Sequence, residues 1–130
     1  MRYKIFGRHT GLRVSALALG TGNFGTGWGH GAEHREAKKI FDGYVEAGGN
    51  FIDTADGYQG GQAEVLVGEF IAADRDHFVV ATKYTFGVTA NDGMSHTGNS
   101  RRIWCAPSRR VSRACRRTAS TCTGSTWPMA

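Results

Sequence analysis

The chain has 130 residues, of which 40% are hydrophobic, a composition typical of one globular domain or part of one. No apolar run approaches the length of a membrane-spanning helix, and no signal-peptide core follows Met1-Arg2-Tyr3-Lys4, so we expect a cytoplasmic protein without a membrane partner. The net charge of +5 is unevenly distributed: residues 1–100 hold nine basic and eleven acidic residues, whereas residues 101–130 hold seven arginines and no acidic residue.

A hairpin and a strand are predicted at the start of the chain. Two apolar segments, residues 3–6 and 12–14, flank a polar turn, a pattern that indicates two antiparallel strands. Residues 16–20 then predict a short apolar strand, which leads into a glycine-rich loop that continues to Gly31.

The clearest predicted helix spans residues 33–47. It ends at a stop signal, the pair Gly48-Gly49. Its apolar residues recur at helical spacing and are expected to share one face: Ala37, Ile40, Phe41 and Tyr44.

Three further elements continue the alternation. Residues 50–54 predict a strand, and residues 63–73 predict a second amphipathic helix. Residues 78–82 are apolar at nearly every position, which indicates a strand covered on both faces. The order hairpin, then β-α-β-α-β, predicts an α/β fold with a parallel sheet, either a (β/α)8 barrel or a doubly wound sheet.

The glycine-rich loop contains a weak nucleotide-binding motif. Residues 20–25 (GTGNFG) match the pattern G-x-G-x-x-G, in which the last glycines open a helix that faces a pyrophosphate. Here more glycines follow, and the helix is expected only near Glu33. We therefore favour a loop over a pocket and keep a Rossmann-type nucleotide-binding domain as an alternative.

Asp53, Tyr58 and Lys83 are the candidate catalytic residues. Asp53 and Lys83 stand at the ends of two successive predicted strands, and the carboxyl ends of parallel strands meet at one rim. A lysine that closes an apolar strand is expected to be desolvated and to need a carboxylate partner, which Asp53 can supply. Taken singly, Asp53 would be an ordinary turn or cap residue and Tyr58 a half-buried aromatic residue.

These three side chains suit proton donation to a carbonyl group. An ammonium close to Tyr58 favours the phenolate form and makes the phenol a better proton donor. Such a phenol can protonate a carbonyl oxygen while a hydride reaches the carbon. Because no side chain supplies a hydride, the reaction requires a cofactor.

Residues 101–130 differ in composition from the rest of the chain. They contain all three cysteines, but without the C-x-x-C pairing of a zinc site, so we expect no bound metal. Their arginines suggest a basic-tailed nucleic-acid-binding module as a second alternative function. No aromatic residues interleave them in the way typical of such modules, so we expect no nucleic-acid partner.

Four stretches of sequence together match one known pattern. They are residues 11–15 (GLRVS), residues 19–25 (LGTGNFG), residues 50–55 (NFIDTA) followed by Tyr58, and residues 81–84 (ATKY). These stretches resemble the aldo-keto reductase family, and the resemblance runs through residues 98–100 (GNS).

The resemblance implies the N-terminal portion of a (β/α)8 TIM barrel, with a hairpin across its bottom, truncated after the third strand. It also implies NADPH-dependent reduction of an aldehyde or ketone, a small carbonyl substrate, by an Asp, Tyr, Lys and His tetrad. Asp53, Tyr58 and Lys83 match the first three members, with Tyr58 as the general acid. The cofactor contacts implied by the resemblance are Gly20, Thr21, Gly22 and Asp53.

The sequence does not supply the histidine of that tetrad, because His96 precedes the expected position. A shift of one nucleotide would supply it: codons exist for residues 118–127 whose neighbouring frame encodes Asp-Arg-Ile-Asp-Leu-Tyr-Trp-Val-His-Leu. The same offset converts residues 103–112 into Asn-Met-Val-Arg-Thr-Val-Glu-Ala-Ser-Leu, an amphipathic helix of the kind expected between the third and fourth strands. We therefore predict one lost nucleotide near the codon for Arg102.

The predicted organisation has two parts. Residues 1–100 are expected to form the N-terminal part of an aldo-keto reductase barrel, and residues 101–130 a disordered, non-native tail. Three βα-type units cannot close an eight-stranded barrel, so we predict a product that folds poorly and is inactive. The sequence leaves the oligomeric state and the substrate open.

Overall fold

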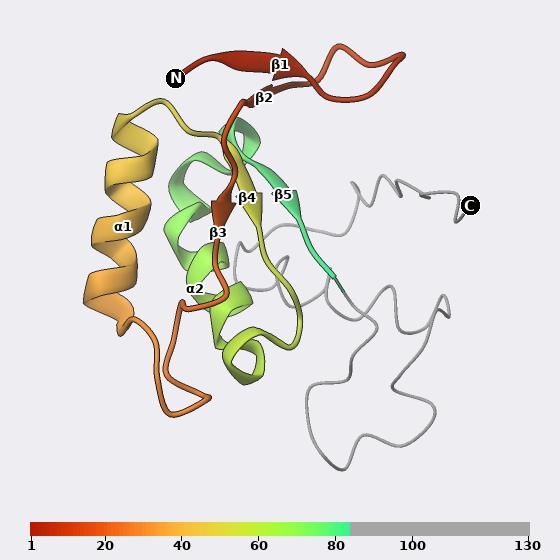
Figure 1. Ribbon diagram of the computed structural model, residues 1–130. Helices are drawn as coiled ribbons and strands as arrows, with labels where there is room; N and C mark the ends of the chain where they lie inside the picture. The colour runs from red at the N-terminus through yellow and green to blue at the C-terminus, as the bar shows by residue number, and fades with distance from the viewer. Residues whose placement is uncertain (84–130) are drawn as a thin grey trace, which may run out of the picture.

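The computed structural model describes residues 1–83, and residues 84–130 are not described further (Figure 1). The predicted tail, the cysteines and His96 therefore lie outside the described residues. In the part that is described, no helix has both the length and the apolar character needed to cross a membrane.

Strands β1 (Tyr3–Ile5) and β2 (Arg13–Ser15) form the predicted antiparallel hairpin. Gly7, with φ of 97°, allows the chain to turn between them. The hairpin lies across the amino ends of the other strands (Figure 1). Phe6 packs there against Phe51, with ring centroids 5.2 Å apart, and so attaches the hairpin to the sheet.

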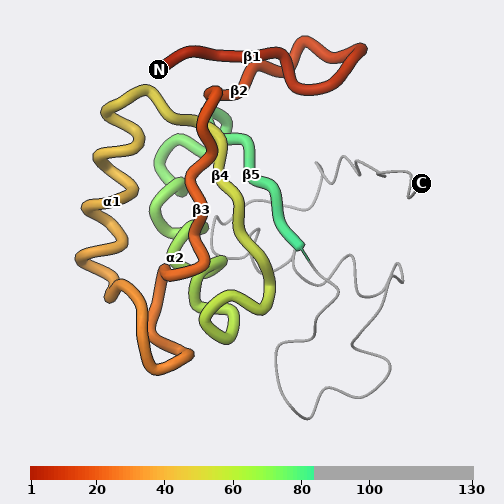
Figure 2. Tube along the Cα trace, in the orientation of Figure 1, coloured from red at the N-terminus to blue at the C-terminus, as the bar shows by residue number. Residues whose placement is uncertain are grey.

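Three parallel strands form the central sheet. In spatial order they are β3 (Leu19–Gly20), β4 (Phe51–Asp53) and β5 (Val79–Ala81). They run in the same direction, each beside the next one along the chain (Figure 2). The predicted strands are all present but shorter than expected, and of residues 16–20 only the last two pair with a neighbour.

Helix α1 (His34–Glu46) confirms the first predicted helix within one residue at each end. Ala37 and Phe41 are buried, but Ile40 is 47% exposed, so its assignment to the buried face is wrong. The reason is geometric: at 3.6 residues per turn, Ile40 lies about 100° around the helix from Phe41, outside the contact centred on Ala37 and Phe41.

Helix α2 (Gln62–Phe70) confirms the second predicted helix but ends three residues early. A short irregular segment, η1 (Tyr58–Gly61), precedes it, with non-helical backbone angles at Gln59 and Gly60. A second short segment, η2 (Ala72–His77), interrupted at Asp74, replaces its predicted last turn. Its amphipathic character is confirmed, since Ala63, Val67 and Phe70 are buried and Leu66 is partly buried.

The hydrophobic core lies between the two helices and the sheet (Figure 1). Ile52 is completely buried in this core, and since strand residues alternate in direction, Phe51 and Asp53 face the other side of the sheet. The residues of β5 are only half-buried, so the prediction of full cover on both faces is wrong for the described residues. Within residues 1–83, α1 and α2 lie on one face of the sheet (Figure 1), and β5 pairs only with β4. The core cluster comprises Phe24, Ala32, Ala37, Phe41, Ile52, Ala63, Val67, Phe70, Ile71 and Phe78.

Candidate active site

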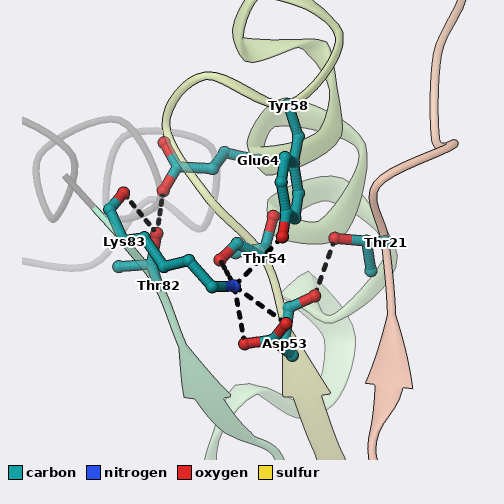
Figure 3. A network of polar contacts seen from close by, with 7 residues as sticks. All are labelled: Thr21, Asp53, Thr54, Tyr58, Glu64, Thr82 and Lys83. Atoms are coloured by element: carbon teal, nitrogen blue, oxygen red, sulfur yellow. Dashed lines mark hydrogen bonds and ion pairs between the residues drawn. The ribbon is translucent and has the colours of Figure 1, made fainter. Parts of the chain in front are cut away.

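Asp53, Tyr58 and Lys83 meet at the carboxyl ends of β4 and β5 (Figure 3). The Lys83 ammonium donates to both carboxylate oxygens of Asp53, at 2.9 and 2.8 Å, and to the Tyr58 hydroxyl oxygen at 3.2 Å. It also lies 3.1 Å from the Thr54 carbonyl oxygen. One cation therefore joins an anion to a phenol.

Strand pairing explains why these residues meet. Asp53 lies opposite Ala81, and the ladder continues past both strands, since Thr54 N–H donates to the Ala81 carbonyl at 2.9 Å. Asp56 N–H then donates to the Lys83 carbonyl at 3.0 Å. These two backbone hydrogen bonds hold the segment that carries Lys83 beside the end of β4. The lysine side chain therefore reaches the Asp53 carboxylate.

The environment of Lys83 differs from the prediction of a desolvated lysine. Its side chain is 45% exposed and that of Asp53 is 41% exposed, because both lie at the rim of the sheet rather than inside it. Partial burial alone would lower the pKa of Lys83, but the hydrogen bonds to Asp53 and Tyr58 and the negative charge of Asp53 outweigh that effect and raise this pKa above its ordinary value. Lys83 is therefore a cation throughout the neutral range.

Tyr58 presents a phenol that the cation can polarise. Its ring is half-buried against the core, and Lys83 Nζ lies 5.0 Å from the ring centroid. Since the ammonium donates to the phenol oxygen, it stabilises negative charge on that oxygen when the phenol gives up its proton. The geometry suits a general acid.

A buried carboxylate that the sequence reasoning missed stands beside this cluster. Glu64 of α2 is completely buried, and the Thr82 hydroxyl donates to its Oε1 at 2.6 Å (Figure 3). Thr82 directly precedes Lys83. The signal in the sequence was an acidic residue between apolar positions of a helix, since such a residue needs a partner when buried.

The start of the glycine-rich loop runs alongside the cluster. Thr21 N–H and the Thr21 hydroxyl each donate to the Asp53 carbonyl at 3.0 Å. A Cβ atom added to Gly22 would lie 4.0 Å from Tyr58 Cε2. Three of the residues expected to contact the cofactor, Gly20, Thr21 and Gly22, are thus brought next to Asp53 and Tyr58.

The Rossmann alternative is wrong, because no helix opens at Gly25. The loop continues to Ala32, whose N–H bonds back to the Asn23 carbonyl at 2.7 Å, and the helix begins at His34. Within residues 1–83, no three His, Cys, Asp or Glu side chains are grouped so as to hold a metal ion.

Comparison with known proteins gives a consistent result. The model of the aldo/keto reductase family matches residues 16–122, which includes part of the arginine-rich segment. Norsolorinic acid reductase of Aspergillus flavus is 47% identical over 92 residues, which cover 67% of this chain and 24% of that protein. An aldo-keto reductase of Emericella nidulans is 37% identical over 111 residues, which cover 78% of this chain and 28% of that protein.

The fold agrees with that of a solved structure. An aldo-keto reductase from Bacillus halodurans, in its holo form, superposes with a TM-score of 0.70 at 26% identity, over 89% of this chain and 37% of that one. The chain therefore spans about a quarter of the length of these two curated relatives. The predicted fold class, the N-terminal portion of a (β/α)8 barrel preceded by a hairpin, is confirmed. By its sequence and its fold, the chain belongs to the aldo/keto reductase family.

Proposed function

We propose that Asp53, Tyr58 and Lys83 form the proton-donating part of a site that reduces an aldehyde or ketone with NADPH. The observation that carries the proposal is the single ammonium of Lys83, which bonds the Asp53 carboxylate and the Tyr58 hydroxyl at the rim of a parallel sheet. Functional residues of barrel enzymes gather at this rim.

Each of the three side chains has a separate task. The Tyr58 hydroxyl gives its proton to the carbonyl oxygen of the substrate, and the chemistry that NADPH would supply when bound is the hydride. Lys83 stabilises the phenolate that remains, and Asp53 holds the ammonium at the distance at which it reaches that oxygen. The proton thus leaves an oxygen that already accepts a hydrogen bond from a cation.

The backbone is open where β3 leads into the glycine-rich loop. Nothing lies within 4 Å of a Cβ atom added to Gly20, so the backbone at this point is accessible. We propose that Gly20, Thr21 and Gly22 contact the nicotinamide of NADPH through their backbone. We propose that Asp53 also contacts the cofactor. The cytoplasmic location stays a prediction of the sequence.

We propose further that residues 1–100 and residues 101–130 have different origins. A lost nucleotide near the codon for Arg102 would leave the tetrad histidine in a frame that the chain does not use, and the 130-residue product would be inactive. Sequencing the coding DNA tests this directly. A neighbouring frame that does not encode the Tyr-Trp-Val-His stretch contradicts the proposal.

Activity measurements test the function itself. We expect no aldehyde-dependent oxidation of NADPH by the 130-residue chain, and clear oxidation once the reading frame is restored at Arg102. In the restored form, Tyr58→Phe should abolish turnover, while Tyr3→Phe, far from the site in the hairpin, should not. A restored form that is folded but inactive would remove the proposed function, and turnover by the 130-residue chain would remove the proposed inactivity.

The nucleic-acid alternative gains no support from residues 1–83. Its arginines lie in the segment outside the described residues. This alternative requires binding to nucleic acid whose affinity falls steeply as salt is added, because phosphate neutralisation releases counterions.

A further inference from the structure

Gln59, the residue after Tyr58, has an unusual backbone conformation. Its φ of 52° is the one positive φ at a residue other than glycine among residues 1–83. An L-amino acid in this region costs free energy relative to glycine, so it persists only where its surroundings hold it. Gln59 is also completely buried, which requires its amide to have hydrogen-bond partners.

The side-chain amide of Gln59 joins two points of the glycine-rich loop. Its Nε2 donates to the Gly22 carbonyl oxygen at 3.1 Å. Its Oε1 accepts the backbone N–H of Trp28 at 2.9 Å. One planar group thus bridges residues six positions apart in a loop that has little regular structure of its own.

Close backbone approach reinforces this bridge. A Cβ atom added to Gly27 would collide with the Gln59 carbonyl, and one added to Gly31 would come within 3.1 Å of Gln59 Nε2. The loop therefore lies directly against Gln59, and glycines at these positions make the contact possible.

Both bridged points flank the Tyr58 ring. A Cβ atom at Gly22 would lie 4.0 Å from Tyr58 Cε2. The Trp28 ring lies edge-on to that of Tyr58, with centroids 6.3 Å apart and an interplanar angle of 83°. Trp28 is 51% exposed, so its position depends on the backbone that carries it rather than on burial.

We propose that Gln59 is a positioning residue that holds the loop of residues 22–28 against Tyr58 and thereby sets the affinity of the site for NADPH. The effect on cofactor affinity rests on the proposed function, whereas the effect on the loop does not. Gln59 reaches the reaction only through the loop, since its own side chain is buried away from solvent.

The first test measures hydrogen exchange of the Trp28 amide in the 130-residue chain. Gln59→Gly is the sharpest variant, because glycine tolerates the positive φ while the amide is lost. We expect the Trp28 N–H to exchange about tenfold faster, the size expected for loss of one net hydrogen bond. The urea midpoint should fall in Gln59→Gly, because a buried side chain with two hydrogen bonds is lost. Gln59→Ala loses the same bonds and also keeps the backbone strain, so its midpoint should fall further.

Gln62→Ala is the matched control. Gln62 also bonds the loop, since its Oε1 accepts the Thr26 N–H at 2.8 Å, but the residue is exposed. We expect this variant to leave the Trp28 amide unchanged. An unchanged rate at Trp28 in Gln59→Gly, or an amide that is already unprotected in the original chain, overturns the role of Gln59.

The second test titrates NADPH by its fluorescence in the frame-restored form. We expect Gln59→Gly to raise Kd about tenfold and Gln62→Ala to change it less than about twofold. If the restored form binds no NADPH, the proposed function fails, while the exchange experiment still decides whether Gln59 holds the loop. Equal Kd values in Gln59→Gly and the original sequence would overturn the link to the cofactor.

Discussion

The two ends of strand β4 are held by different chemistry. At its start, the neutral side chain of Asn50 is buried and ties the hairpin to the sheet, accepting the Ser15 N–H at 2.7 Å and donating to the Arg13 carbonyl at 3.1 Å. At its other end, the charged pair of Asp53 and Lys83 is close to half exposed.

This difference separates stability from reactivity within one strand. Buried neutral hydrogen bonds contribute to folding, because their loss leaves unsatisfied groups away from water. An exposed ion pair contributes little to folding, since solvent screens it. The charges at the carboxyl end of β4 are therefore not needed to hold the sheet together, as the proposed function requires of groups that act on a substrate.

Removing the cation should give the largest effect, and on activity alone. In the frame-restored form, Lys83→Met should lower kcat/KM by about 10²–10⁴, the range that general acid catalysis contributes. The urea unfolding midpoint should stay close to the original value, because the side chain is 45% exposed. A large loss of stability with unchanged turnover would contradict the proposal that the charged end of β4 serves reactivity rather than stability.

Removing the Asn50 amide at the start of β4 should lower stability and leave activity unchanged. Asn50→Ala deletes two hydrogen bonds of a buried side chain and should lower the free energy of unfolding by about 2–4 kcal/mol. Once the variant is folded, its kcat should match that of the original sequence. Urea titration measures the first quantity, and a lowered kcat in folded protein would contradict the separation of the two ends.

Thr82→Val tests how much the hydrogen bond to the buried carboxylate of Glu64 contributes to stability. The variant keeps the shape of the side chain but removes the hydroxyl that donates to Glu64 at 2.6 Å. We expect a loss of about 1–3 kcal/mol in stability, because a buried acceptor loses a donor. Thr82→Ser, which keeps the hydroxyl, is the matched control and should lose less.

The pH dependence should report the raised pKa of Lys83. The pKa of Lys83 in the folded protein exceeds the ordinary value of 10.5. The support that this cation gives to the Tyr58 oxygen is therefore complete below pH 10.5 and is lost as the pH rises through the folded pKa. Asp53→Asn removes the negative charge that raises this pKa, so the alkaline loss of activity should move to lower pH. An alkaline limb that stays in place would show that another group titrates there.

Ile40→Gln should have the smallest effect. The side chain is 47% exposed on α1, so we expect a change in the free energy of unfolding within about 0.5 kcal/mol. Phe41→Ala, one position further, should cost about 3–5 kcal/mol because Phe41 is buried in the core. Thermal unfolding of the two variants would separate the faces of the helix.

The order of the elements could be predicted because it depends on local pattern. Apolar spacing along α1 and α2, the stop at Gly48 and the alternation with short strands each involve residues near one another in sequence. The approach of Asp53 and Lys83 could also be predicted, since adjacent parallel strands bring their carboxyl ends to one rim. Both follow from rules that act within a few residues or between neighbouring strands.

The sequence by itself therefore determined the elements, the family and the three side chains of the rim. Only the tertiary structure decided that Lys83 is half exposed, that Ile40 faces outward and that Gln59 adopts a positive φ to bridge Gly22 and Trp28. Those features depend on where a loop of one segment lies against a turn more than thirty residues away, as the separations of 37 and 31 residues in the two Gln59 bonds show. No local propensity specifies such a contact, because its free energy exists only after the segments have packed.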